Sequence, residues 1–221
     1  IIGLLVINTL VLGILWLGSI KDFMFSLTYA FKHKAFEKEY QKIKDVELTK
    51  ENEPRVLLLY CTCNDFNPDA LYKSSSQDYS NFKVVILDDS NKNEYISLID
   101  KYQSQHSGVE VIRRKDHKGY KAGNLNNYLM GRDDYDYFVV LDSDEIIPQD
   151  YIKKVLKYFA YDPNCGAVQA KHRALEGKNV FQGLMGMCVK SNGTTAQVVK
   201  NFYGANALIG HGMTISKECY I

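Results

Sequence analysis

The sequence predicts an α/β domain with a mostly parallel sheet and helices on both faces, preceded by a transmembrane helix. Short apolar runs alternate with helical stripes between residues 55 and 170, which is typical of βαβ units with right-handed crossovers. Three of these runs end in acidic or polar segments. The first 20 residues carry no charge, and about 20 apolar residues are enough to span a bilayer as a helix.

The composition excludes some classes of protein. Of 221 residues, 27 are basic and 26 are acidic, so no excess of charge favours nucleic acid as a partner. The five cysteines are odd in number and scattered, which favours a reducing compartment over a disulfide framework. Cys61 and Cys63 form a C-x-C pair with no second pair at zinc spacing, so no zinc site is expected there.

The N-terminal segment is expected to cross a membrane. It lacks the basic n-region and the cleavage site of a signal peptide, and a buried helix of a soluble protein is the alternative. The aromatic residues of 23–31 are typical of a membrane interface, and the lysines that follow mark the cytoplasmic side. We therefore expect a transmembrane and interfacial segment over 1–31, a charged linker over 32–54 and a cytoplasmic domain over 55–221.

The elements of this domain follow from the spacing of its apolar residues. Short apolar runs bounded by polar or turn residues predict strands, and apolar residues at helical spacing predict the helices between them. The strands are expected at 55–60, 82–87, 109–112, 137–141 and 167–170. The helices are expected at 69–76, 94–104, 122–130 and 151–159, with a methionine-rich apolar helix at 184–189.

The strand over 137–141 ends in two carboxylates, Asp142 and Asp144. Like charges this close repel each other, and burying either one alone is costly. A hard divalent cation relieves both effects, and Mg²⁺ is commonly held by one or two carboxylates together with phosphate oxygens. The alternative is the acidic first turn of a helix that begins near Pro148.

Acidic residues also follow the first two strands, where Asp65 and Asp89 lie. In open α/β sheets ligands bind at the carboxyl ends of the strands, so these residues should share one edge with Asp142 and Asp144. No G-x-G-x-x-G follows the first strand and no G-x-x-x-x-G-K-[ST] occurs. This argues against a dinucleotide-binding protein and against a P-loop nucleotide triphosphatase.

Four segments, in this order, resemble the family 2 glycosyltransferases, which are inverting enzymes with the Rossmann-like GT-A fold. The resemblance is strongest to the processive membrane branch that includes cellulose synthase catalytic subunits. The segments are Leu57–Asp65, Val84–Ser90, Arg113–Asn126 with its Lys-Ala-Gly-Asn-Leu-Asn stretch, and Val139–Glu145 with the D-x-D motif Asp142-Ser-Asp144. Acidic pairs are common in proteins, and the third segment makes the match specific.

The resemblance implies a nucleotide-sugar donor, most simply a UDP-sugar, bound with Mg²⁺ or Mn²⁺. Asp89 would hold the nucleoside, and Asp65 and its loop would contact the base or ribose. Lys118 and Lys121 would donate to phosphate. The implied donor-binding residues are Thr62, Cys63, Asp65, Asp89, Lys118, Lys121, Asn124, Asp142 and Ser143. The implied metal ligands are Asp142 and Asp144, and His211 and Gly212 would lie on the acceptor side. Gly119 and Gly123 would permit close backbone approach or form a plain turn.

The implied reaction is inverting sugar transfer to a growing polysaccharide, and the whole protein would be a multi-pass protein of the cell membrane. A general base must take the acceptor proton, and in the family it lies beyond the last matching segment. We therefore expect donor and metal binding without efficient transfer from these 221 residues alone. The alternatives are transfer of one sugar to a lipid acceptor, a nucleotide-sugar-binding module without turnover, and a nucleotidyltransferase. The expected partners are the donor, a glycan or glycolipid acceptor and membrane lipid, without nucleic acid.

Overall fold

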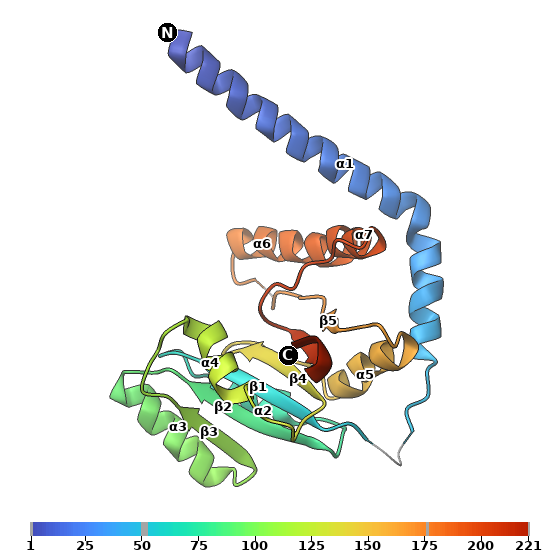
Figure 1. Ribbon diagram of the computed structural model, residues 1–221. Helices are drawn as coiled ribbons and strands as arrows, with labels where there is room; N and C mark the ends of the chain where they lie inside the picture. Colours follow the sequence, from blue (N-terminus) through green and yellow to red (C-terminus); the bar gives the residue numbers. More distant parts are fainter. Residues whose placement is uncertain (1, 50–52, 176, 221) are drawn as a thin grey trace. The chain divides into compact units, whose positions relative to one another are not determined.

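The computed structural model describes residues 2–49, 53–175 and 177–220, which form two compact units. One unit comprises 1–42 and 171–207, and the other comprises 43–170 and 208–221. Figure 1 follows the chain through both units from the N-terminal helix to the C-terminus. The domain boundaries expected from the sequence stay a prediction.

The second unit is built on a six-stranded sheet with the order β3-β2-β1-β4-β6-β5. Its strands are β1 (Val56–Thr62), β2 (Phe82–Asp88), β3 (Val109–Arg113), β4 (Tyr137–Asp142), β5 (Ala167–Gln169) and β6 (Met213–Ser216). The first four run parallel, whereas β6 runs antiparallel to both β4 and β5. The mostly parallel sheet is thus confirmed, and it contains one reversed strand that the alternation of strands and helices did not indicate.

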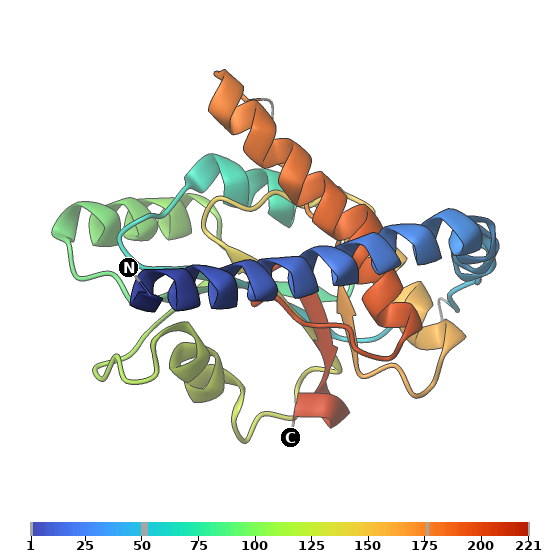
Figure 2. The same ribbon diagram turned by 90° about the horizontal axis from the view of Figure 1, so that it is seen from above.

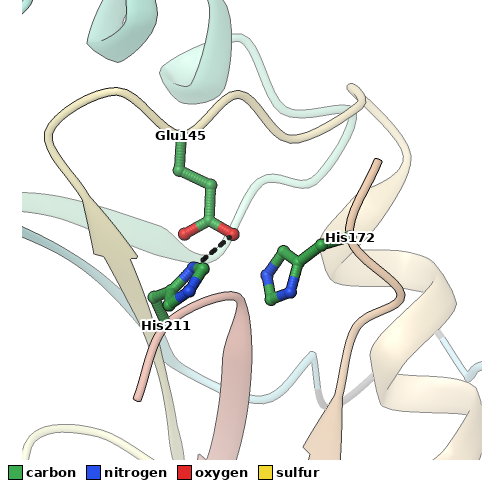
Figure 3. Close-up of side chains that lie close together, drawn as sticks. All are labelled: Glu145, His172 and His211. Atoms are coloured by element: carbon green, nitrogen blue, oxygen red, sulfur yellow. Dashed lines mark ion pairs between the residues drawn. The ribbon is translucent and has the colours of Figure 1, made fainter. Parts of the chain in front are cut away.

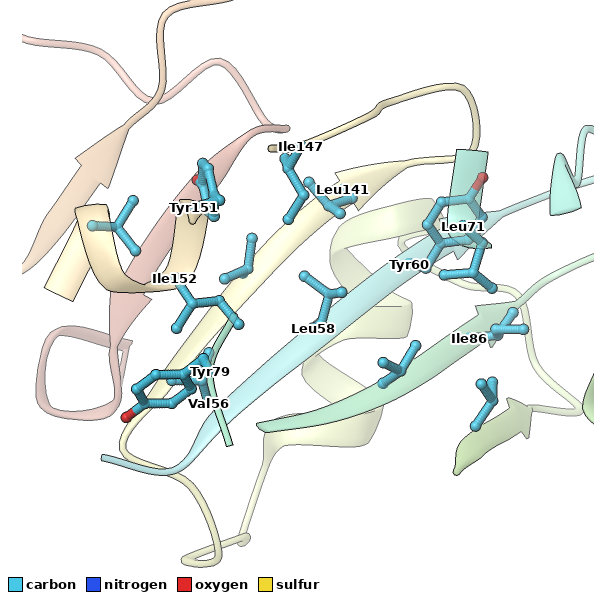
Figure 4. Packing of buried hydrophobic residues seen from close by; sticks show 14 of the residues in the cluster. Val56, Leu58, Tyr60, Leu71, Tyr79, Ile86, Leu141, Ile147, Tyr151 and Ile152 are labelled. Carbon is cyan, nitrogen blue, oxygen red and sulfur yellow. The ribbon is translucent and has the colours of Figure 1, made fainter. Parts of the chain in front are cut away.

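Helices cover both faces of this sheet, which agrees with central strands that are apolar on both sides. They are α2 (Pro68–Ser75), α3 (Asn93–Gln105), α4 (Tyr120–Leu129), α5 (Tyr151–Tyr161) and α8 (Lys217–Tyr220). One buried cluster joins alternate residues of β1, such as Leu58, to α2, α3 and α5 (Figure 4). The other joins the intervening residues, such as Leu57, to α4 and α8. The alternation of side chains along each strand therefore fills two cores.

Local signals account for several element ends. Asn67 caps α2 by accepting a hydrogen bond from the backbone N–H of Ala70 (3.1 Å), and Pro68 occupies the first helical turn. The helix alternative for the D-x-D segment is wrong, because β4 ends in a turn and α5 begins only at Tyr151. Neither Asp142 nor Pro148 therefore belongs to a first helical turn.

The first unit contains α1 (Ile2–Lys44) up to Lys42, followed later in the chain by α6 (Val180–Ser191), the π-helix η1 (Asn192–Ala196) and α7 (Gln197–Phe202). The last three succeed one another without a break (Figure 2). α1 continues through residues 31 and 32, so the apolar segment and the lysine-rich segment form one helix. In the described part of the chain, it is the one helix long and apolar enough to cross a membrane.

Candidate functional site

The register of the sheet brings the acidic strand ends to one edge. Cys61 of β1 pairs with Asp142 of β4, and Thr62 of β1 pairs with Asp88 of β2. The three strands are parallel neighbours, so the loops that follow them leave from the same carboxyl edge. Asp142 ends β4, and Asp65, Asp89 and Asp144 are carried by these loops, which is the geometry that parallel α/β sheets use to bind ligands.

Asp65 connects the loop after β1 to the loop after β4. Its Oδ1 accepts hydrogen bonds from the hydroxyl of Thr62 and the backbone N–H of Cys63, both 2.8 Å away. Its Oδ2 accepts from the hydroxyl of Ser143 at 2.6 Å. Both oxygens of this carboxylate therefore hold the edge together, and Asp65 fixes the positions of the other expected donor-binding residues in these two loops.

Asn64 connects the same β1 loop to the loop after β2. Its backbone has a positive φ of 61°, a conformation in which Asn is more easily accommodated than most side chains. Its N–H donates to the hydroxyl of Ser90 (2.9 Å), and its Oδ1 accepts from the backbone N–H groups of Asn91 (3.0 Å) and Lys92 (2.9 Å). Asn64 belongs to the loop that was expected to contact the base or ribose, and the structure adds its bonds to the loop after β2.

Asp89 forms a paired contact with Arg114. The guanidinium donates from Nε to Oδ1 (2.9 Å) and from Nη2 to Oδ2 (2.6 Å), the two-bond geometry that suits arginine and carboxylate. The side chains are only 7% and 10% exposed. The nitrogens also donate to the backbone carbonyls of Lys118 and Tyr120, both at 2.8 Å. Arg114 therefore ties the carboxylate after β2 to the loop before α4.

Glycines allow this loop to fold closely onto the start of α4. Gly119 precedes the helix with φ of 73°, and its carbonyl accepts from the N–H of Gly123 at 2.8 Å. A Cβ at Gly123 would collide with the carbonyl oxygen of Lys118 and lie 2.9 Å from Nη1 of Arg114. The expected close backbone approach is confirmed at both glycines.

Lys121, in the first turn of α4, forms an ion pair with Asp142 at the end of β4. Its Nζ also donates to the carbonyl of Gly210 at 2.7 Å. The same edge affects Cys61, whose pKa is raised to about 12 by burial, with the charges of Asp142 and Asp89 raising it and that of Lys121 lowering it. The lysine therefore joins α4, β4 and the loop before β6, and it balances part of the acidic charge.

The turn after β4 carries three carboxylates. Asp142 is half-buried and Asp144 is exposed, while Glu145 accepts from the backbone N–H of Asp142 through Oε2 (3.3 Å). Oε1 of Glu145 lies 3.4 Å from Nδ1 of His211 (Figure 3), and that nitrogen lies 4.0 Å from Oδ2 of Asp142. Gly212 donates its N–H to the carbonyl of Val140 at 2.8 Å. The two expected acceptor-side residues thus adjoin the D-x-D turn.

The remaining expected site residues differ in their surroundings. The side chain of Lys118 is 91% exposed, and its Nζ lies 3.2 Å from Oδ2 of Asp116. This ion pair lies outside the network of hydrogen bonds described above. Asn124 is buried in α4, and its Oδ1 has no hydrogen-bond donor among the described residues. A buried acceptor without a donor is costly, so a ligand or water that donates to it would stabilise this position.

The composition of the turn fits a hard divalent cation. Carboxylate oxygens are the preferred protein ligands of Mg²⁺, and the ion keeps positions for water and phosphate. The Asp144 carboxylate is exposed, and the ion pairs described at this turn involve Asp142 and Glu145 instead. The negative charge of Asp142 is already paired with the positive charge of Lys121. The open carboxylate is therefore better placed to accept a cation than the paired one.

Comparison with known proteins identifies the family. The protein-family model with the description "Glycosyl transferase family 2" matches residues 62–219. This range is most of the chain and includes the whole acidic edge. The chain belongs to glycosyl transferase family 2. The resemblance recognised from the four sequence segments is confirmed, and the GT-A fold agrees with the sheet and its carboxyl-edge loops.

Relatives within family 2 act in different reactions. The chain is 26% identical over 167 residues to a poly-beta-1,6-N-acetyl-D-glucosamine synthase of Staphylococcus aureus, covering 72% of this chain and 40% of that protein. It is 32% identical over 90 residues to a beta-monoglucosyldiacylglycerol synthase of Synechocystis, covering 40% of this chain and 18% of that protein. The chain thus spans about two fifths or less of the length of these curated relatives.

One solved structure gives a comparison at the level of the fold. It is the mannosyltransferase PcManGT from Pyrobaculum calidifontis in complex with GDP-Man and Mn²⁺, with a TM-score of 0.50 and 25% identity. The match covers 67% of this chain and 46% of that protein. A member of the same fold therefore binds a nucleotide sugar together with a divalent cation.

Three residues of the edge were not given a role of their own from the sequence: Asn64, Arg114 and Glu145. Arg114 stands in a basic run, Arg113-Arg-Lys115, where nothing in the letters distinguishes it from its neighbours. Glu145 directly follows the D-x-D motif and could have been grouped with it on the same electrostatic grounds. Asn64 had a local signal, because asparagine in a polar loop after a strand is a frequent turn former.

Proposed function

We propose that this chain carries the donor-binding part of a sugar transferase: the acidic carboxyl edge binds a nucleotide-sugar donor, most simply a UDP-sugar, from which the whole protein transfers the sugar. The observation that carries the proposal is the convergence of Asp65, Asp89 and the D-x-D carboxylates on three neighbouring parallel strands. Membership of family 2 supports the reaction class. The PcManGT complex supports a nucleotide sugar as the donor class.

The roles follow from the contacts. Asp89, held by Arg114, presents a fixed carboxylate to the nucleoside, and the Thr62–Asp65 loop lines the base or ribose. Ser143 and Asn124 supply hydrogen-bonding groups beside them, and Lys121 places a positive charge where the diphosphate would lie. Lys118 reaches the phosphates only by leaving Asp116, because it now points into solvent.

Asp144, with Asp142 beside it, would hold a Mg²⁺ or Mn²⁺ ion. When bound, the ion would neutralise the departing diphosphate. The protein itself fixes the turn through Glu145, which accepts from the N–H of Asp142, and keeps His211 close to the two carboxylates. His211 and Gly212 lie on the side from which an acceptor hydroxyl would approach, with inversion at the anomeric carbon.

The acceptor proposed first is a growing polysaccharide, because the poly-N-acetylglucosamine synthase matches over 72% of the chain. The second candidate is a single transfer to a lipid acceptor, which the more identical but shorter match to the beta-monoglucosyldiacylglycerol synthase favours. A lipid acceptor would place the reaction at a membrane. We propose that α1 spans it with the second unit on the cytoplasmic side, since the apolar residues of α1 are exposed and lysines follow them.

Calorimetry tests the donor site directly. UDP-GlcNAc, UDP-glucose, GDP-mannose and UTP are titrated into the chain with and without Mn²⁺. We expect Mn²⁺-dependent binding of a nucleotide sugar that is lost in Asp144→Asn and kept in Asp133→Asn, since Asp133 is exposed before β4 at the opposite edge. Preference for UTP over every nucleotide sugar would favour the nucleotidyltransferase alternative. Equal binding by both variants would overturn the proposed site.

A transfer assay separates the two acceptor classes. The chain in membranes is supplied with radiolabelled donor together with either an oligosaccharide or diacylglycerol, and the products are separated by size and by solvent extraction. Polymeric product supports the first candidate and a single glycolipid product supports the second. Donor binding without either product agrees with the expectation that these residues bind the donor without efficient transfer.

A further inference from the structure

The helix α6 exposes an apolar surface that the sugar-transfer site does not use. None of its residues is buried, and large apolar side chains are exposed along it, with Val180 at 81% and Met187 at 68%. The exposed apolar residues are Val180, Phe181, Leu184, Met185 and Met187, to which the exposed Cys188 is added. Contiguous apolar surface of this kind usually marks an interaction site.

These side chains gather on one side of α6. At about 100° per residue, they fall within an arc of roughly 160°. The small residues Gly183 and Gly186 lie outside that arc and approach the preceding loop, where a Cβ at Gly186 would lie 3.3 Å from that of Ala174. Phe181 and Met185, at one border of the arc, also line a groove of about 380 Å³ between the loop and α6. The outward face of α6 therefore consists of Val180, Leu184, Met187 and Cys188, which do not line that groove.

The charged residues nearest to α6 in the sequence are lysines. No acidic residue occurs from 177 to 217, whereas Lys178 lies two residues before α6 and Lys190 lies in its last turn, and both are exposed. On a helical projection Lys190 falls about 60° outside the apolar arc. Exposed apolar residues bordered by lysines are the composition of helices that lie in the interface of a bilayer, and anionic headgroups attract such lysines.

The packing of the first unit connects this helix to the candidate span. The end of α7 packs on α1: the rings of Phe202 and Phe36 lie 5.6 Å apart, and the hydroxyls of Tyr203 and Thr28 lie 3.2 Å apart. Thr28 is about 12 Å beyond Ile20 along a helix axis, which is at the outer side of the headgroup layer if residues 1–20 fill the hydrocarbon, since that layer is about 5–8 Å thick. α6 leads through η1 into α7, so a continuous helical segment joins it to this contact with α1.

From these observations we propose that the outward face of α6 docks on the anionic surface of the membrane that α1 crosses. This inference rests on the proposed insertion of α1 and goes beyond the sugar-transfer site. Docking would hold the segment from 171 to 207 against the lipid. A lipid-linked or membrane-extruded acceptor would then meet the protein at a fixed height.

Fluorescence quenching in nanodiscs tests the two membrane contacts separately. Trp16, the only tryptophan, lies in α1, and its emission reports insertion of that helix through quenching by acyl-chain nitroxides. For α6, a bimane label is placed on Cys188 in the background of Cys63→Ser and Cys219→Ser, which removes the other exposed thiols. A label at Lys101→Cys on α3, with Cys188→Ser, provides the solvent-exposed control, because Lys101 is exposed.

We expect nitroxide lipids to quench the Cys188 label and iodide to quench the Lys101→Cys label, with stronger lipid quenching in phosphatidylglycerol than in phosphatidylcholine. Lys178→Gln combined with Lys190→Gln should lower the ratio of docked to undocked α6 about thirtyfold, since each lysine near an anionic surface contributes about one fivefold step. Lys101→Gln should leave this ratio unchanged.

Iodide quenching at Cys188 equal to that of the control label would overturn the proposal. Protection from both quenchers would also overturn it, because it would show that protein covers the face. Quenched Trp16 with either result leaves the insertion of α1 intact.

Discussion

Replacing Arg114 by alanine should destabilise the second unit strongly. The variant would lose two charge-assisted hydrogen bonds to Asp89 and two bonds to backbone carbonyls of the loop before α4. It would also leave the Asp89 carboxylate, 10% exposed, without its cation. Removing one partner of a buried ion pair typically costs about 3–5 kcal/mol. We expect a loss of that size in the free energy of unfolding.

Urea denaturation followed by far-UV circular dichroism measures this loss. Lys153→Ala serves as a control for removing a surface ion pair, since Lys153 and Asp78 are 42% and 73% exposed and such pairs contribute about 0–1 kcal/mol. Adding Asp89→Asn to Arg114→Ala should recover part of the stability, because the uncompensated charge is removed. If Arg114→Ala and Lys153→Ala differ by less than about 1 kcal/mol, the argument from burial and pairing is wrong.

Three further outcomes test particular contacts. Gly123→Ala should lower the free energy of unfolding and weaken donor binding, because its Cβ would collide with the loop backbone. Gly108→Ala is the control, since its Cβ would meet nothing within 4 Å, and equal urea midpoints for the two variants would contradict the prediction. The hydrogen bond from Arg55 holds the pKa of Asp136 below its ordinary 3.8, so its stabilisation is complete above about pH 4 and is lost as pH falls through the folded value. Asp136→Asn should therefore flatten stability against pH below about pH 4, and an unchanged acid limb would argue against the pair. Burial raises the pKa of Cys61 to about 12, so iodoacetamide at pH 8 should modify the exposed cysteines well before it, as mass spectrometry of the peptides can show.

The sequence predicted the sheet well because its physical causes are local. Runs such as Val56–Thr62 and Tyr137–Asp142 are apolar on both faces, so they had to be central strands, and the helices between them had to cross over. Parallel neighbours then require the acids after β1, β2 and β4 to share an edge. The edge could therefore be inferred without knowing the order of the strands.

The partners within the edge depend on three-dimensional placement. Arg113 and Arg114 are adjacent and chemically identical, yet Arg113 pairs with Asp88 and Arg114 with Asp89. Successive residues that leave a strand point in different directions, and the direction in the loop after β3 cannot be read from the letters. The antiparallel direction of β6 could not be predicted either. The strand has only four residues, Met213–Ser216, and an alternation of apolar and polar residues that short does not indicate the direction of a strand.

The contacts divide the acids of the edge into two kinds. Both oxygens of Asp65 and both oxygens of Asp89 are taken up by hydrogen bonds from the protein, so these carboxylates build the shape of the site and reach a ligand only as fixed acceptors. Asp144 is exposed and lies in the turn that His211 adjoins through Asp142 and Glu145. Since a cation needs oxygens that are not already paired with protein cations, the electrostatic part of donor binding depends most on Asp144. The precision of the site depends instead on the internal bonds of Asp65 and Asp89.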